Sequence, residues 1–201
     1  MPPRTGKLGS ALLALSKGLN ATGAPWMCIG GIAVIAQGVR RTTTDIDVTV
    51  RGEGVHLDAF VKALARHGIR PRINDALKFA RSSQVLLLEH SASGVALDVS
   101  LAWLSFEHEA LAARIPINFA GVIVPAARPE DLLIYKVFAG RPHDLQDAES
   151  LLLMHKKSID LTRVRAVLSQ LSEMSDEPGG AARLESIIER KRSKPGRTRR
   201  P

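Results

Sequence analysis

Two aspartates one residue apart, Asp45 and Asp47, are the first side chains that suggest a chemical role. They begin the segment 45–50, where polar and apolar residues alternate as in a β-strand. Side chains two positions apart on a strand share a face, so we expect both carboxylates beside Thr49 on one face. Neighbouring carboxylates repel unless a cation lies between them, and oxygen-rich sites suit magnesium. The pair therefore predicts a magnesium site, although so short a pattern also occurs at ordinary strand edges and turns.

A third aspartate, Asp98, lies in the apolar segment 95–102, which predicts another strand. Apolar residues flank Asp98 on both sides, so we expect its carboxylate to be buried. A buried carboxylate is costly unless it is paired or bound to a metal ion. Asp98 therefore extends the predicted site to three carboxylates.

A glycine pair, Gly30-Gly31, lies upstream of these acids, between a predicted strand at 26–29 and a predicted helix at 32–37. Because glycine has no side chain, a phosphate could approach the backbone N–H groups at the start of this helix. The other interpretation is a simple tight turn. The acids that follow favour the phosphate-binding interpretation.

The segments around these residues fall into two halves. The first half alternates predicted helices, at 8–19, 32–37 and 57–67, with predicted strands at 26–29, 45–50, 85–89, 95–102, 115–118 and 122–124. The second half predicts helices at 129–139, 143–156, 160–172 and 181–192. We therefore expect an α/β core at 1–126, a helical region at 127–190 that completes the site, and a disordered basic tail at 191–201.

The composition of the 201-residue chain restricts its environment and partners. Its single cysteine, Cys28, excludes an intrachain disulfide and agrees with a reducing compartment. No apolar run approaches the ~20 residues that span a bilayer, so we expect a cytoplasmic protein with no membrane partner. The net charge is +8, but residues 189–201 hold seven basic residues against one acidic residue and supply most of it. This tail could attract RNA or could simply aid solubility.

A further group of charged residues follows in the helical half. Together with the glycines and aspartates, it gives a pattern that resembles the DNA polymerase beta-like nucleotidyltransferase superfamily, and within it the bacterial AbiEii-type branch. Many members of that branch are toxins of toxin–antitoxin pairs. The resemblance covers roughly residues 10–155. The pattern is Gly30-Gly31, Arg41-x-Thr43-x-Asp45-x-Asp47, Asp98 and Lys136-x4-Arg141-x2-Asp144-x2-Asp147.

The resemblance implies a mixed-sheet core and a reaction that uses two Mg²⁺ ions and a nucleoside triphosphate (NTP). Asp98 would hold the ion that activates the acceptor hydroxyl, and Lys136 would neutralise phosphate charge. The implied metal ligands are Asp45, Asp47 and Asp98. The implied nucleotide-binding residues are Gly30, Gly31, Arg41, Thr43, Lys136, Asp144 and Asp147, the last two by positioning the lysine or the acceptor.

Two positions depart from the superfamily pattern. Gly31 stands where serine is common, which removes a hydroxyl contact to phosphate, and His143 stands where the AbiEii-type branch often has lysine. Lys136 also has an ordinary interpretation, because a helix lysine is usually solvated. The other histidines show no metal-ligand spacing, and we assign them no function.

The sequence leaves the acceptor open. The toxin-like branch implies RNA, including tRNA ends, or a protein hydroxyl, with a cognate antitoxin as a partner. A second possibility is a small-molecule acceptor, as in aminoglycoside nucleotidyltransferases. A third is a nucleotide-binding or partner-binding module without catalysis, against which the retention of three aspartates argues.

Overall fold

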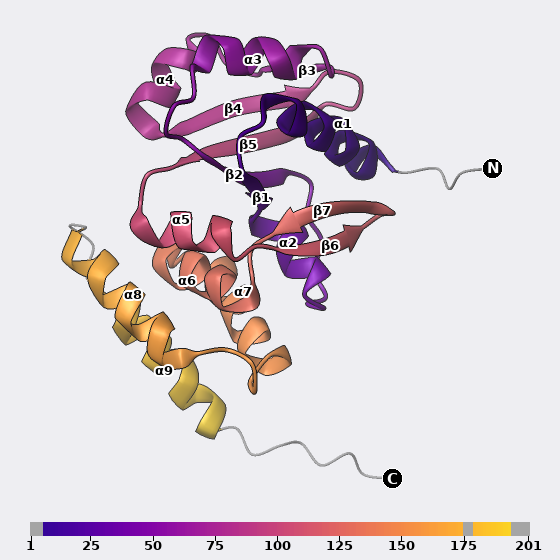
Figure 1. Cartoon of the computed structure of the whole chain (residues 1–201). Helices are drawn as coiled ribbons and strands as arrows, with labels where there is room; N and C mark the ends of the chain where they lie inside the picture. The colour runs from indigo at the N-terminus through magenta and orange to yellow at the C-terminus, as the bar shows by residue number, and fades with distance from the viewer. Residues whose placement is uncertain (1–5, 175–178, 194–201) are drawn as a thin grey trace. The chain divides into compact units, whose positions relative to one another are not determined.

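The computed structural model describes residues 6–174 and 179–193. The chain forms two compact units, Met1–Arg128 and Pro129–Pro201, and this division lies two residues beyond the boundary that the sequence predicts. The first unit carries a sheet and the second is helical (Figure 1).

Within the described residues, the first unit contains a seven-stranded sheet in the order β3-β4-β5-β2-β1-β7-β6. β2 is parallel to β5 and β1 is parallel to β7, whereas the other neighbours are antiparallel. The mixed sheet confirms the predicted α/β fold class. The strands are β1 (Trp26–Cys28), β2 (Ile46–Arg51), β3 (Ile69–Pro71), β4 (Val85–His90), β5 (Val95–Ala102), β6 (Ile115–Phe119) and β7 (Val122–Ala126).

The helices described in this unit are partly those that the sequence predicts. The first three are confirmed, whereas the last two and the short strand β3 are additions. These added helices have only eight residues each, which is shorter than the window over which a helical period can be established. The helices are α1 (Lys7–Thr22), α2 (Gly30–Ala36), α3 (Leu57–Ala65), α4 (Ala76–Ser83) and α5 (Ser105–Ala112).

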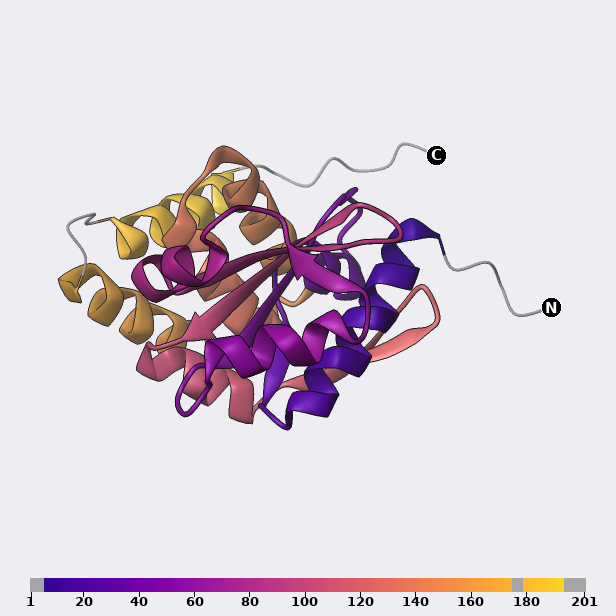
Figure 2. The ribbon, with the colours of Figure 1, turned by 90° about the horizontal axis from the view of Figure 1, so that it is seen from above.

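Alternation along the central strands separates an apolar face from a more polar one. Ile46, Val48 and Val50 on β2 are fully buried, as are Leu97 and Val99 on β5. α1 packs against α3 and also against β4, β5 and β7. Figure 2 shows α1 and α3 side by side. The buried face anchors the strands, so the residues between the apolar ones are positioned by the core.

The described part of the second unit consists of four helices whose bounds lie within two residues of those predicted. α6 packs against each of the other three, and Arg163 Nη1 donates a 2.8 Å hydrogen bond to the fully buried Asp131 Oδ1, which joins α6 to α8. The helices are α6 (Pro129–Ala139), α7 (Pro142–Met154), α8 (Leu161–Met174) and α9 (Gly180–Ser193).

The predicted tail at 191–201 is tested in small part. Residues 191–193 belong to α9, which corrects the start of the predicted disordered segment, and 194–201 lie outside the described residues. The helix continues because the basic residues here follow the helical segment without a glycine or proline until Pro195. Of the helices that the structure describes, none is long and apolar enough to cross a membrane.

Candidate active site

The sheet brings two of the three predicted aspartates together. β2 and β5 pair in parallel with Asp47 directly opposite Asp98, so the two residues lie on one face about one strand spacing, or ~5 Å, apart. Asp47 is half-buried and the Asp98 side chain is 35% exposed. Asp45, Asp47 and Asp98 are called the sheet acids below.

Two expectations about the sheet acids were wrong in detail. β2 begins at Ile46, so Asp45 precedes the strand and is exposed, and its Oδ1 accepts a 2.8 Å hydrogen bond from Thr43 Oγ1. Asp98 is not buried, because successive side chains of β5 alternate between the two faces of the sheet. Leu97 and Val99 lie on the buried face, and Asp98 lies on the other, less covered face. Its ionised state therefore needs no metal ion to offset burial.

Asp98 has a partner that the sequence did not indicate. Arg72 Nη1 donates a 2.7 Å hydrogen bond to Asp98 Oδ1. Arg72 follows β3, and its backbone N–H donates to the carbonyl oxygen of Leu87, the residue opposite Asp98 on β4. β3 has three residues and ends in Pro71, which disfavours a strand prediction, so no sequence signal placed Arg72 here.

The glycine pair lies directly against this group. Gly30 has φ +61°, and a Cβ atom there would lie 2.6 Å from Asp47 Cγ. A Cβ atom at Gly31 would lie 2.7 Å from Cβ of Thr43. Since both distances are far below van der Waals contact, the absence of side chains is what lets α2 begin against Asp47 and Thr43. The structure thus brings the predicted glycines to the sheet acids.

Further observations describe the surroundings of Asp47 and the loop before it. The backbone N–H of Ile29 donates a 2.9 Å hydrogen bond to the carbonyl oxygen of Asp47, which ties the end of β1 to the start of β2. Burial and, to a smaller extent, the negative charge of Asp47 together raise the pKa of the Cys28 thiol to about 12. Arg41, in the same loop region, donates from Nε to the carbonyl oxygen of Thr42 at 3.1 Å.

A second charged group lies within the helical unit. Lys136 Nζ on α6 lies 2.8 Å from Asp144 Oδ1 and 3.0 Å from Asp147 Oδ2, both on α7. The Lys136 side chain is 9% exposed, so the ordinary interpretation of a solvated lysine is wrong. The reason is the short connection between α6 and α7, which lets the two helices pack and enclose the three charges. Lys136, Asp144 and Asp147 are called the lysine cluster below.

The lysine cluster is compensated electrically. Burial raises the pKa of the Asp144 carboxyl, but hydrogen bonds from Lys136 and Arg141 lower it by more, so the net pKa is below its ordinary value. Arg141 Nε lies 2.5 Å from Asp144 Oδ2, and the largely exposed His143 reaches Asp144 Oδ1 at 3.5 Å. The carboxylate therefore stays ionised at neutral pH and holds the ammonium in place.

A family model agrees with the fold. The model described as "Nucleotidyltransferase of unknown function (DUF6036)" matches residues 11–187, which is most of the chain. This chain belongs to that nucleotidyltransferase family. It is therefore an enzyme of the class that the sequence predicted, whereas the narrower AbiEii-type assignment stays a prediction. No curated protein matches the chain in sequence.

Solved structures share the nucleotidyltransferase fold. A solution structure of the antibiotic-resistance factor ANT(2'')-Ia is 20% identical, covers 94% of this chain and 91% of that chain, and has a TM-score of 0.50. A crystal structure of ANT(2'')-Ia in complex with adenylyl-2''-tobramycin is 18% identical, covers 90% and 98%, and has a TM-score of 0.51. A lincomycin-bound lincosamide antibiotic adenylyltransferase, LnuA, is 16% identical over 70% and 93%, with a TM-score of 0.48.

The donor types at the sheet acids suit magnesium, although their side chains do not yet converge. Among the described residues, no three His, Cys, Asp or Glu side chains are grouped so that they could hold a metal ion. Asp45 and Asp98 each engage an oxygen with another side chain, Thr43 and Arg72 respectively. Carboxylate oxygens are the ligands that magnesium prefers, and Asp47 and Asp98 are register neighbours on one face of the sheet.

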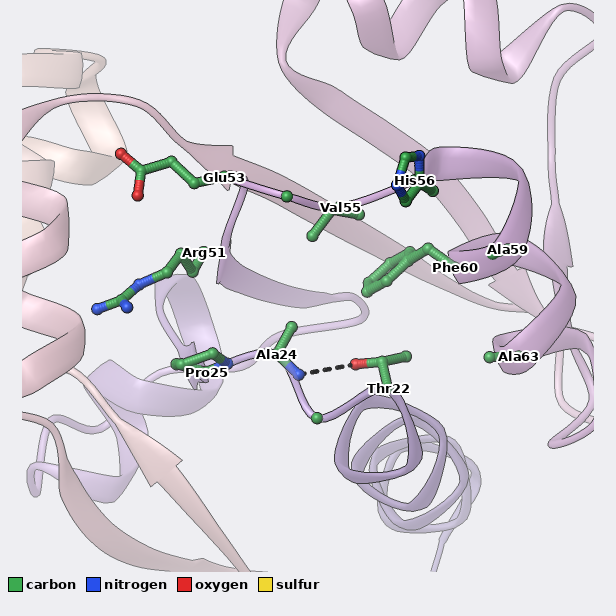
Figure 3. A pocket seen from close by; sticks show the side chains of 12 residues that line it. Thr22, Ala24, Pro25, Arg51, Glu53, Val55, His56, Ala59, Phe60 and Ala63 are labelled. Atoms are coloured by element: carbon green, nitrogen blue, oxygen red, sulfur yellow. Dashed lines mark hydrogen bonds between the residues drawn. The ribbon is translucent and has the colours of Figure 1, made fainter.

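A pocket of this nucleotidyltransferase lies at the other end of the same strands. Its volume is about 410 Å³, and Figure 3 shows Pro25, Arg51, Glu53 and Phe60 around it. Because β1 and β2 are antiparallel, residues before β1 and after β2 meet there, about 13 Å along β2 from Asp47. The pocket is thus separate from the sheet acids.

Proposed function

We propose that this nucleotidyltransferase moves a nucleoside monophosphate from an NTP to an acceptor hydroxyl at the sheet acids. The observation that carries the proposal is the register of β2 and β5, which sets Asp47 beside Asp98, with Gly30 packed against Asp47. Asp45 and Asp47 would hold two Mg²⁺ ions, and Asp98 would hold one of them. When bound, the ions would lower the pKa of the attacking hydroxyl and neutralise the leaving pyrophosphate.

The bond changes follow from this arrangement. The acceptor oxygen forms a bond to the α-phosphorus, the bond from that phosphorus to the oxygen bridging to the β-phosphate breaks, and pyrophosphate leaves. Asp98 would accept the proton of the hydroxyl. Gly30 and Gly31 would let the triphosphate approach the backbone, and Arg41 and Thr43 would contact it from the adjoining loop.

The lysine cluster would take the phosphate-neutralising role that the resemblance implies for Lys136. Lys136 has three N–H donors, of which Asp144 and Asp147 engage two. In this role the two carboxylates position the lysine. His143, which replaces a lysine of the resembling branch, would add no permanent charge.

The favoured acceptor is RNA, including tRNA ends, ahead of a protein hydroxyl, in a toxin-like role with a cognate antitoxin. Charge supports this order, because the first unit alone has 14 basic and nine acidic residues and the whole chain carries +8. Such a balance attracts a polyanion. The second candidate is a small-molecule acceptor, favoured by the fold shared with ANT(2'')-Ia, whose crystal structure holds adenylyl-2''-tobramycin.

The test is transfer of label from each α-³²P NTP in Mg²⁺ to three acceptor pools, namely total RNA, cell protein and an aminoglycoside panel. We expect labelled RNA with wild type and a loss of roughly 1,000-fold in Asp47→Asn, the scale of removing one group that stabilises a transition state. Circular dichroism should show both proteins equally folded. Full transfer by Asp47→Asn would refute the site, and labelled aminoglycoside with unlabelled RNA would move the acceptor to the second candidate.

A further inference from the structure

The side chain of Arg72 takes an unusual path to Asp98. Its backbone N–H is 3.1 Å from the carbonyl oxygen of Leu87, which places Arg72 opposite β4, whereas its guanidinium bonds Asp98 on β5, the next strand. The guanidinium therefore crosses Leu87 to reach the carboxylate beside Asp47. Arg72 is 27% exposed and Asp98 35% exposed, so the pair is neither buried in the core nor fully solvated.

A second arginine, Arg70 on β3, shows what an ordinary pair looks like here. Arg70 Nε lies 2.8 Å from Glu89 Oε1, its register neighbour, and the Arg70 side chain is 64% exposed. Exposed pairs of this kind contribute little to stability. The Arg72–Asp98 pair has nearly the same length but lies on a proposed metal ligand. The two pairs therefore share a length but differ in the path of the arginine and in what surrounds the carboxylate.

We infer that Arg72 is a positioning residue that competes with a divalent cation for Asp98 and releases it when a triphosphate arrives. The inference rests on the proposed function. A guanidinium bonded to Asp98 Oδ1 occupies one oxygen and repels a divalent cation on the same carboxylate. A triphosphate offers the guanidinium other oxygens, which arginine binds in bidentate fashion, so the carboxylate becomes available together with the nucleotide.

This competition couples the two ligands. The cation binds weakly to the nucleotide-free enzyme and tightly once the nucleotide is present, and by linkage the nucleotide binds better with the cation. Removal of the arginine charge strengthens cation binding without nucleotide and reduces the additional strengthening that nucleotide gives. A merely structural arginine would leave this coupling unchanged.

The experiment measures Mn²⁺ affinity of the full chain by electron paramagnetic resonance, with and without a non-hydrolysable NTP analogue. In Arg72→Gln we expect Mn²⁺ alone to bind about tenfold more tightly, the order expected for one unit charge ~5 Å from a divalent ion. The strengthening by the analogue should fall by the same factor. Arg72→Lys, which keeps the charge, should bind Mn²⁺ alone as wild type does. Arg70→Gln is the matched control that should change nothing.

The outcomes separate this inference from the proposed function. If Asp47→Asn abolishes Mn²⁺ binding while Arg72→Gln binds Mn²⁺ as wild type does, the metal site stands and the role of Arg72 is refuted. If wild type and Asp47→Asn bind Mn²⁺ equally, or neither binds it with the analogue, the metal site itself is refuted and the role of Arg72 falls with it. Tighter binding in both Arg72→Gln and Arg70→Gln would indicate a general charge effect and would also refute the inference.

Discussion

The two charged groups of this enzyme, one in each unit, solve opposite electrostatic problems. In the lysine cluster, two buried carboxylates share one buried ammonium, and Arg141 adds a second positive charge, so the group is neutral. The three sheet acids and Arg72 together sum to −2, and Asp45 and Asp98 are exposed to solvent to differing degrees. The first arrangement needs no ligand to be stable, whereas the second leaves a net negative charge that is partly exposed to solvent.

This difference indicates in which group a substitution should change the stability of the fold and in which it should change ligand affinity. Removal of one charge from a compensated buried group lowers the free energy of unfolding, because the remaining charges are left buried without partners. A solvated group of like charges loses little stability and can even gain some when one charge is removed. Stability and ligand affinity therefore become separate readouts for the two units.

Lys136→Met should produce the largest loss of stability. It leaves Asp144 and Asp147 buried without their ammonium, and removal of one partner of a buried pair typically costs about 3–5 kcal/mol. Urea denaturation followed by circular dichroism measures it. Lys156→Met, an exposed lysine in the same unit, is the control and should change stability by less than about 0.5 kcal/mol.

Equal stability of Lys136→Met and wild type would break the contrast between the two groups. A triple substitution sharpens it, because Lys136→Met with Asp144→Asn and Asp147→Asn removes all three charges. This variant should recover part of the loss, since neutral side chains cost less to bury than unpaired carboxylates.

Gly30→Ala should be the most damaging single change near the sheet acids. The alanine would have to keep the left-handed φ of +61°, and its Cβ atom would collide with Asp47. Gly94→Ala is the matched control, because Gly94 has φ +70° with nothing within 4 Å. We expect about 1 kcal/mol for Gly94→Ala from backbone strain and about 3 kcal/mol for Gly30→Ala. Equal losses in urea denaturation would show that the approach of Gly30 to Asp47 carries no cost.

The contrast also explains what the sequence could and could not predict. Lys136, Asp144 and Asp147 lie on two predicted helices joined by a short connection, and the family resemblance implied that the two acids position the lysine. Asp47 and Asp98 were each assigned to a strand, but their register depends on β2 pairing with β5 in parallel across two helices, which no local pattern encodes. Arg72 reached Asp98 through β3, whose three residues carry too little pattern to detect.

The alternation of buried and less buried residues along β2 and β5 was predicted correctly, but the start of β2 and the burial of Asp98 were not. The expected strand started at Asp45, but the ladder starts at Ile46, so the first acid is a loop residue held by Thr43. The same periodicity that located Asp98 also contradicts its expected burial, since Ala96, Asp98 and Ser100 share the less covered face. How much a face is covered depends on the helices packed on it, and that is a tertiary property.

Asp144→Asn should make stability less sensitive to acid. The Asp144 pKa is lowered in the folded state, so its stabilisation is present above the unfolded pKa of ~3.9 and is lost as the pH falls through the folded pKa. We expect the variant to be about 2 kcal/mol less stable at pH 7 and the difference to shrink progressively below pH ~4. Denaturation from pH 7 to pH 2 measures it. A difference independent of pH would mean that the charge of Asp144 does not stabilise the cluster.

Thr49→Val should give the smallest effect and the opposite sign. Thr49 lies on the face of Asp47 but is fully buried, and within the described part of the chain its hydroxyl has no hydrogen-bond partner. Valine has the same shape, so the change removes an uncompensated buried polar group and should stabilise the enzyme by about 1 kcal/mol. Thr22→Val is the control, because Thr22 Oγ1 donates to the carbonyl oxygen of Leu19 at 2.6 Å and should lose about 1 kcal/mol. A loss of stability in Thr49→Val as large as that in Thr22→Val would mean that the fold requires the Thr49 hydroxyl. The polar surroundings of the sheet acids would then extend along β2 to a residue that the structure shows as buried.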